Sequence, residues 1–237
     1  MVIDASKGVE AQTRKLFKVC VMRHIPIFTF INKMDREARD TFELLDDIEK
    51  ELGIATCPVN WPIGSGKAFK GVYDREHREI ELFSDTQKGT KMGEVKKISL
   101  DDPELSTLIE EDALSLLEEE VELLDGASAE FDQELVSKGE LSPVFFGSAL
   151  TNFGVETFLQ HFLSMTSSPL PRKSDKGEID PMTEKDFSAF VFKIQANMNK
   201  AHRDRIAFMR ICSGEFEAGM EVYHMQGGRK VRLSQPQ

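Results

Sequence analysis

The chain has 237 residues, of which 40% are hydrophobic and 30% are charged, and its formal net charge is -11. It is long enough for one or two globular domains, and its negative charge excludes a uniformly basic surface, so we expect no sequence-specific DNA partner. Cys20, Cys57 and Cys212 are far apart and odd in number, which predicts neither a disulfide framework nor a zinc site. No apolar run is long enough to span a membrane and no signal peptide is recognisable, so we expect a cytoplasmic protein without a membrane partner.

The first fifty residues alternate apolar runs with amphipathic segments. Met1–Asp4 is predicted to be a buried strand, and because no turn or cap stands ahead of it we expect the chain to begin inside an element. Helical spacing follows over Glu10–Val21, and Pro26–Ile31 is predicted to be the next buried strand. Asp40–Leu52 is predicted to be an amphipathic helix that Gly53 ends. This alternation predicts a parallel α/β sheet.

A polar tetrad, Asn32-Lys33-Met34-Asp35, follows the second strand, at the end of the sheet where open α/β folds bind ligands. Guanine presents N1–H and an N2 amine side by side, and one ionised carboxylate such as Asp35 accepts both. Adenine would leave that carboxylate unpaired, at a cost of about 1–3 kcal/mol. Asn32 offers a donor and an acceptor to the base edge, and Lys33 an aliphatic stem to the base plane. The alternative is a solvated turn followed by a helix cap.

The next loop superficially resembles a phosphate-binding loop. It follows a single strand predicted over Thr56–Ile63. The phosphate-binding motif needs a Gly five positions before its Gly-Lys pair and a Ser or Thr after the Lys. Trp61 and Ala68 occupy those positions around Gly66 and Lys67. We therefore reject a phosphate site here and predict a hairpin with residues 69–73.

Residues 63–140 break the alternation of strands and helices, so we interpret them as an inserted α+β subdomain. They contain a strand over Glu79–Phe83, a loop over residues 87–93, an acidic helix over Pro103–Leu124 that Gly126 ends, and a short helix over residues 128–139. The acidic helix is either a solvated face or a docking surface for a basic partner.

The strand and helix pattern returns at Ser142–Phe146, a short buried strand that leads into Gly147-Ser148-Ala149-Leu150. Gly147 allows a close approach, and we expect the backbone N–H groups around Ser148 and Ala149 to donate to guanine O6, where adenine carries an amine. Taken alone, this segment is more typical of a simple strand-to-helix turn. Together with the tetrad, also at the end of a buried strand, it indicates a guanine site. A helix is predicted over Phe153–Met165.

Beyond residue 168 the composition and the period change. Residues 169–186, rich in Pro, Lys and Asp, are predicted to be a linker. Four short runs of period two then follow, separated by Gly-rich turns, and they predict a β-barrel that this chain does not close. The runs are Phe187–Ile194, Arg205–Ile211, Met220–Met225 and Lys230–Leu233.

Five segments make the sequence similar to the translational GTPase family, and within it to the bacterial release factor 3 branch more than to elongation factor G. The segments are residues 3–13, 30–36, 61–64, 69–74 and 147–150. The resemblance covers essentially the whole chain. It implies the fold class α/β, with a partial parallel sheet of the P-loop GTPase type over residues 1–62 and 141–168. The α+β insertion lies between these two parts, and an incomplete translation-factor β-barrel occupies residues 187–237.

The resemblance also implies a cofactor, partners and site residues. The family binds GTP or GDP, and its ribosome-dependent GTPase recycles class-one release factors after peptide release. Its partners are therefore the ribosome and class-one release factors. By position in the family motifs, the guanine-binding residues of this chain would be Asn32, Lys33, Asp35, Ser148, Ala149 and Leu150.

The sequence departs from the family in its phosphate-binding parts. It contains no Gly-x4-Gly-Lys-Ser/Thr, no Asp-x-x-Gly and no switch-one Thr, which in the family hold the phosphates, magnesium and the attacking water. We therefore expect no catalytic residue, no metal site and no GTP hydrolysis by this chain, and self-association through an exposed sheet edge at the first strand. The alternatives are a non-catalytic module that contacts the ribosome or another protein, and a part of another translational GTPase such as elongation factor G.

Overall fold

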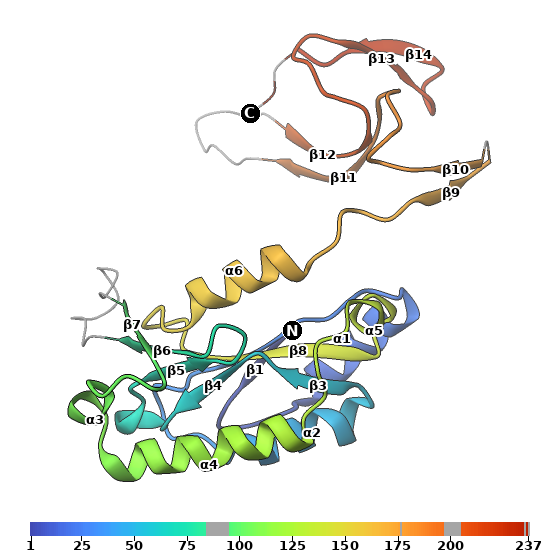
Figure 1. Cartoon of the computed structure of the whole chain (residues 1–237). Helices are drawn as coiled ribbons and strands as arrows, with labels where there is room; N and C mark the ends of the chain where they lie inside the picture. Colours follow the sequence, from blue (N-terminus) through green and yellow to red (C-terminus); the bar gives the residue numbers. More distant parts are fainter. Residues whose placement is uncertain (84–94, 176, 197–204, 235, 237) are drawn as a thin grey trace. The chain divides into compact units, whose positions relative to one another are not determined.

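The computed structural model describes residues 1–83, 95–175, 177–196, 205–234 and 236. The chain forms two compact units, residues 1–165 and residues 166–237 (Figure 1). The loop predicted over residues 87–93 lies outside the described residues. In the part of the chain that is described, no helix has the length and the apolar character needed to cross a membrane.

A four-stranded parallel sheet, in the order β1-β2-β8-β3, is the centre of the first unit. Its strands are β1 (Val2–Asp4), β2 (Thr29–Asn32), β8 (Leu141–Phe146) and β3 (Ala55–Pro58). Phe30 of β2 lies opposite Phe145 of β8, so these two strands end side by side. Among the described residues β1 pairs with β2 alone, which makes it an edge strand.

Three helices cover this sheet: α1 (Ala11–Met22), α2 (Thr41–Leu52) and α6 (Val155–Met165). Successive side chains of a strand point to opposite faces, and the two faces have separate cores. Ile31 and Phe146 lie in the core closed by α1 and α2, whereas Phe30 and Phe145 face α6. Figure 1 shows α2 and α6 on opposite sides of the sheet.

A second, antiparallel sheet in the order β4-β5-β6-β7 forms most of the predicted insertion. Its strands are β4 (Asn60–Ile63), β5 (Gly71–Asp74), β6 (Glu79–Phe83) and β7 (Val95–Ser99). The single strand predicted over residues 56–63 is wrong, because Pro58 pairs with Val144 in the parallel sheet while Asn60 pairs with Asp74 in the antiparallel one. The hairpin predicted with residues 69–73 is confirmed, and a short 3-10 turn, η1 (Gly66–Ala68), connects its strands.

The acidic segment is two helices, α3 (Leu105–Leu108) and α4 (Glu111–Ala127), and α5 (Gln133–Lys138) follows. The buried Ile109 takes an extended backbone and separates the first two. The predicted end at Gly126 is wrong, since α4 continues to Ala127. Trp61 of β4 is fully buried, donates its indole N–H to Glu120 of α4 (2.8 Å) and contacts the Phe146 ring. The two sheets therefore share one hydrophobic core.

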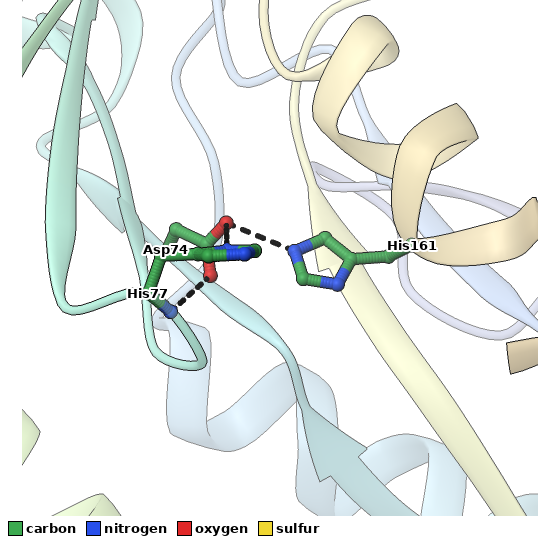
Figure 2. A group of neighbouring side chains, drawn as sticks. All are labelled: Asp74, His77 and His161. Carbon is green, nitrogen blue, oxygen red and sulfur yellow. Dashed lines mark hydrogen bonds and ion pairs between the residues drawn. The ribbon is translucent and has the colours of Figure 1, made fainter. Parts of the chain in front are cut away.

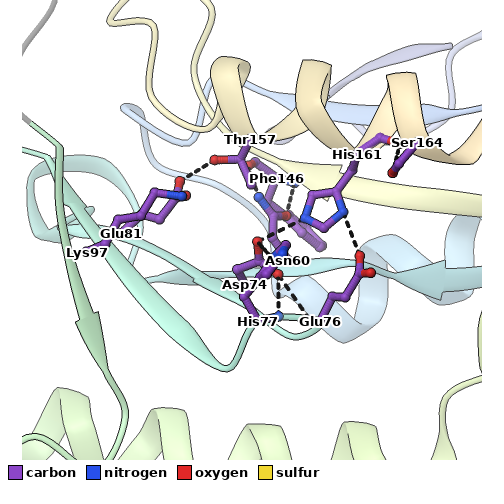
Figure 3. Close-up of polar contacts among 10 residues, drawn as sticks. All are labelled: Asn60, Asp74, Glu76, His77, Glu81, Lys97, Phe146, Thr157, His161 and Ser164. Carbon is purple, nitrogen blue, oxygen red and sulfur yellow. Dashed lines mark hydrogen bonds and ion pairs between the residues drawn. The ribbon is translucent and has the colours of Figure 1, made fainter.

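Polar contacts join α6 to the antiparallel sheet (Figure 3). The Thr157 hydroxyl of α6 donates to Glu81 of β6, and Glu81 also pairs with Lys97 of β7 at 2.8 Å. His161, one turn further along α6, contacts Asp74 at the end of β5 (2.9 Å). All of these groups except Lys97 are buried, so the contacts fix the helix on the sheet.

The second unit consists of antiparallel hairpins in its described part. They are β9 (Arg172–Ser174) with β10 (Gly177–Ile179), β11 (Ser188–Ala196) with β12 (Arg205–Ser213), and β13 (Glu221–His224) with β14 (Arg229–Arg232). The first hairpin lies within the segment expected to be a linker. The other four strands are those predicted from the period of two, and each pairs with one partner only among the described residues.

Candidate nucleotide-binding site

The two strand-end turns predicted to bind one base lie side by side, because β2 and β8 are adjacent parallel strands. The Ser148 hydroxyl donates to Asp35 Oδ1 at 2.5 Å. The Ala149 N–H donates to Asn32 Oδ1 at 2.9 Å. Each turn thus fixes a polar side chain of the other.

Backbone hydrogen bonds join the same two turns. The Gly147 N–H donates to the Ile31 carbonyl (3.0 Å), and the Met34 N–H donates to the Gly147 carbonyl (3.1 Å). The Met34 carbonyl in turn accepts from the Gly66 N–H (2.8 Å). The loop around Gly66 and Lys67, which superficially resembles a phosphate site, is therefore hydrogen-bonded to the tetrad through Met34.

Gly147 stands where no side chain fits. A Cβ atom at this position would lie 2.4 Å from the Phe153 carbonyl oxygen and 2.8 Å from Cζ of Phe30. The strand before it is fixed by Asn60, whose carboxamide accepts from the Phe146 N–H (2.7 Å) and donates to the Phe146 carbonyl (3.1 Å). The expected close approach at Gly147 is confirmed.

Lys33 has a left-handed backbone, with φ of 74°, which is uncommon for a residue other than glycine. Its ammonium group pairs with Asp4 Oδ2 at 2.6 Å, across the end of the sheet from β2 to β1. The hydrogen bond from Lys33, with further hydrogen bonds from Ser6, lowers the pKa of Asp4 to about 2. The strained turn is therefore held by an ion pair as well as by the sheet.

The two turns keep one acceptor position at Asp35 available, but they already use the N–H groups expected at guanine O6. Asp35 is half-buried, and its Oδ2 accepts no hydrogen bond from the described residues. A carboxylate has about four lone-pair positions, so the Ser148 bond leaves room for N1–H and the N2 amine. The N–H groups expected at O6 are already used: that of Ser148 donates to Phe153 and that of Ala149 to Asn32.

Leu150 is the remaining donor of this turn. The residue is 67% exposed, and its backbone N–H makes no backbone hydrogen bond among the described residues. Recognition of O6 would therefore use the Leu150 N–H, or would require Ala149 to exchange the Asn32 oxygen for the base. The six predicted site residues therefore lie in two adjacent turns at the same end of the sheet. The donor expected to face O6 changes from the N–H groups of Ser148 and Ala149 to that of Leu150.

Sequence reasoning missed Asp4 and Asn60. Asp4 ends an apolar strand at the same end of the sheet as the tetrad. This position could have predicted that its carboxylate lies near Lys33. Asn60 is fully buried within an apolar run, and a buried carboxamide needs hydrogen-bond partners nearby. Its partner, Phe146, is 86 residues away in sequence, so only the folded chain identifies it.

Residues 1–168 match the family described as the elongation factor Tu GTP binding domain, and residues 186–237 match elongation factor G domain 2. The chain belongs to the elongation factor Tu GTP-binding domain family, which is a class of translational GTPases. The predicted fold class, an α/β unit with a parallel sheet followed by a β domain, is confirmed by these matches and by the strand pairing.

Within that class, the resemblance to bacterial release factor 3 is also confirmed. A peptide chain release factor 3 of Symbiobacterium thermophilum is 57% identical over the whole chain, which covers 45% of that relative. A relative of the same name from Gloeobacter violaceus is 56% identical over 99% of this chain and 44% of the relative. Another from Synechococcus elongatus is 54% identical over 100% of this chain and 42% of the relative. The chain therefore spans less than half the length of these relatives.

Proposed function

We propose that this chain binds a guanine nucleotide by holding the base between the Asn32–Asp35 turn and the Ser148–Leu150 turn. The observation that carries the proposal is Asp35: the Ser148 hydroxyl fixes its Oδ1, while its Oδ2 accepts no hydrogen bond from the part of the chain that the structure describes. A fixed carboxylate with one open oxygen is matched to the paired donors N1–H and N2–H of guanine. Asn32 holds the second turn in place through Ala149.

The phosphate and magnesium part of such a nucleotide has no counterpart in the sequence. The Gly-x4-Gly-Lys-Ser/Thr and Asp-x-x-Gly motifs that position phosphates and metal are absent from these 237 residues. We therefore expect base recognition with modest affinity and no GTP hydrolysis, because phosphoryl transfer depends on those positioning groups.

The biological role we propose is that of a translational GTPase of termination. It would act on the ribosome in the cytoplasm and remove class-one release factors after peptide release. The support is the 52–57% identity to relatives named peptide chain release factor 3 over nearly the whole chain.

Nucleotide binding can be tested by titrating a fluorescent GDP into the purified chain. Asp35→Asn replaces one acceptor oxygen by an amide NH2 donor, so we expect guanine affinity to fall at least about tenfold, as for loss of a charged hydrogen bond. The same variant should gain affinity for a xanthine nucleotide, whose C2 carbonyl accepts from the new amide NH2. Hydrolysis of GTP should stay at the rate of buffer alone.

Glu37→Gln is the matched control, since it neutralises an exposed carboxylate two residues further on. It should leave guanine affinity unchanged. Equal affinity of the parent chain and of Asp35→Asn for guanine, with no gain for xanthine, would contradict the base pocket. Such a result would favour the second candidate, a non-catalytic interaction module.

One feature favours that second candidate. Helix α4 presents exposed carboxylates beside exposed leucines: Glu118, Glu119, Glu122, Leu116 and Leu123. Such a mixed acidic and apolar face is suited to a basic protein partner. The nucleotide titration distinguishes the two functions because α4 contributes nothing to the two turns.

We also propose that the chain self-associates through β1. This strand is short, but its outer edge has no neighbour among the described residues, and Val2 is 66% exposed. Leu16 and Met22 of α1, 58% and 70% exposed, extend the apolar surface. An unpaired strand beside an apolar surface is a template for pairing with a second copy.

A further inference from the structure

Three side chains of metal-binding types meet at a place that the nucleotide site does not use. Asp74 ends β5, His77 lies in the turn before β6, and His161 is on α6. Asp74 Oδ2 is 3.0 Å from His77 Nδ1 and 2.9 Å from His161 Nε2. The three atoms all lie within 4.8 Å of one another (Figure 2).

The backbone fixes the direction of the carboxylate. Asp74 Oδ1 accepts from the N–H groups of Glu76 (3.0 Å) and His77 (3.2 Å), which are in the turn that Asp74 begins. The other oxygen, Oδ2, is thereby directed between the two imidazole rings, as Figure 2 shows. Ligands that are oriented before binding lose little conformational entropy when a metal arrives.

Glu76 fixes the direction of the buried imidazole. Its Oε2 lies 2.9 Å from His161 Nδ1, on the side of the ring opposite Asp74 (Figure 3). A hydrogen bond from one ring nitrogen to a carboxylate selects the tautomer in which the other nitrogen is free to bind a metal. His161 therefore contacts a carboxylate through the ring nitrogen that would not bind the metal, as metal-binding histidines usually do.

We propose that Asp74, His77 and His161 form a site for a late first-row divalent cation, with Zn²⁺ as the best match. Two imidazole nitrogens and one carboxylate oxygen are a zinc ligand set that leaves a fourth position for water. Glu76 is a positioning residue for His161. The proposal is independent of the nucleotide proposal, because the two sites share no residue.

The two contacts to Asp74 need only a small adjustment, while the two imidazole nitrogens, which lie within 4.8 Å of each other, must end at a similar spacing. Tetrahedral bonds of about 2.0–2.1 Å separate two ligand atoms by about 3.3 Å, so the observed 2.9 and 3.0 Å must open by a few tenths of an ångström. The cation would replace the hydrogens that the two rings now direct at Asp74. The Asp74 and His161 side chains are each 3% exposed, whereas His77 is 60% exposed and provides the path of entry.

The first test is a Zn²⁺ titration of the whole, tag-free chain after chelator treatment, followed by calorimetry. We expect one site per chain, a rise in melting temperature with Zn²⁺ and no competition from Mg²⁺, which prefers oxygen ligands. Co²⁺ as a spectroscopic probe should give the visible bands of four-coordinate nitrogen and oxygen ligation without a thiolate charge-transfer band. A thiolate band would place the metal on a cysteine and overturn the assignment.

His77→Gln removes the exposed ligand and leaves the Asp74–His161 contact intact, so the variant should fold normally in chelator. It should lower Zn²⁺ affinity at least about tenfold, as loss of metal-site contacts typically does. His224→Gln changes an exposed histidine of β13 and should have no effect. Unchanged affinity in His77→Gln, or no stoichiometric binding by the parent chain, would mean that the cluster is an ion-pair contact only.

The role of Glu76 has a separate readout. Glu76→Ala should lower Zn²⁺ affinity about tenfold while the melting temperature in chelator changes little, because Glu76 is 59% exposed. Glu76→Gln keeps an acceptor for His161 and should restore most of the affinity. Equal loss in both variants would overturn the positioning role.

Discussion

At the scale of single residues, the candidate site depends on two positions with unusual local constraints, Gly147 and Lys33. Gly147 has the Phe153 carbonyl and the Phe30 ring where a Cβ would lie. Lys33 has a positive φ that few side chains adopt, and its ammonium group is held by Asp4. These constraints come from contacts within the protein, so they can be tested without any nucleotide.

Gly147→Ala should destabilise the first unit by about 1–3 kcal/mol, the usual cost of overpacking a core. The new methyl would be only 2.4 Å from backbone oxygen, which cannot move without disturbing β8 and α6. Gly126→Ala is the matched control: nothing lies within 4 Å of its Cβ position on α4, so it should stabilise by about 0.5–1 kcal/mol. Urea unfolding of both variants measures the difference, and equal stabilities would contradict the packing described for Gly147.

The Asp4–Lys33 pair should make stability depend on pH in the acid range. Folding lowers the pKa of Asp4 from 3.8 to about 2, so the pair stabilises fully above pH 3.8. That stabilisation is lost as the pH falls through about 2. Because Lys33 is 43% exposed, we expect Asp4→Asn to cost only about 1 kcal/mol at neutral pH.

The measurement is the unfolding free energy of the parent and of Asp4→Asn between pH 7 and pH 2. The difference should be constant above about pH 4 and shrink below it. Asp46→Asn removes the exposed Asp46–Lys50 pair of α2 and should cause no measurable change at any pH. A constant difference down to pH 2 would show that Asp4 does not titrate through this pair.

At the scale of elements, β1 is an edge strand of the parallel sheet in the described part of the chain. It pairs with β2 on one side, and its other edge offers backbone donors and acceptors that a buried type of strand normally satisfies. Ile3 is 1% exposed while Val2 is 66% exposed, so the face of β1 that carries Ile3 is packed and the face that carries Val2 is open. Among the described residues, the outer edge of β1 therefore remains available for pairing.

We expect concentration-dependent dimers in sedimentation velocity experiments. Val2→Lys places a charge beside the edge and should shift the chain toward monomer, since charged edges prevent strand pairing. Leu163→Lys adds the same charge at a leucine of α6 that is 76% exposed and should leave the association unchanged. A monomer at every concentration tested would rule out the proposed pairing.

At the scale of the whole molecule, the two units differ in how much apolar surface they bury. One continuous core runs through the parallel and antiparallel sheets of the first unit. In the second unit, β11 leaves Phe190, Phe192 and Ile194 more than half exposed. A two-stranded hairpin is marginally stable, and no second layer covers this one among the described residues, so we expect the first unit to supply most of the folding free energy.

Much of this architecture was predictable from local patterns. The period of two identified β11 to β14, and the polar tetrad after a buried strand placed Asn32 and Asp35 correctly at the end of the sheet. The strand prediction failed where one apolar run contains two strands that pair in different sheets. Residues 56–63 look like one strand, but the pairing partner changes between Pro58 and Asn60, and local sequence carries no information about partners.

The sequence by itself indicated the class of protein, because five of its segments resemble those of translational GTPases, among them a tetrad and a later turn that each follow an apolar strand. Only the tertiary structure decided which donors remain open. Ser148 and Asp35 are 113 residues apart, and Asp74 and His161 are 87 residues apart. Hydrogen-bond partners depend on distances after folding, and sheet order, not sequence separation, sets those distances.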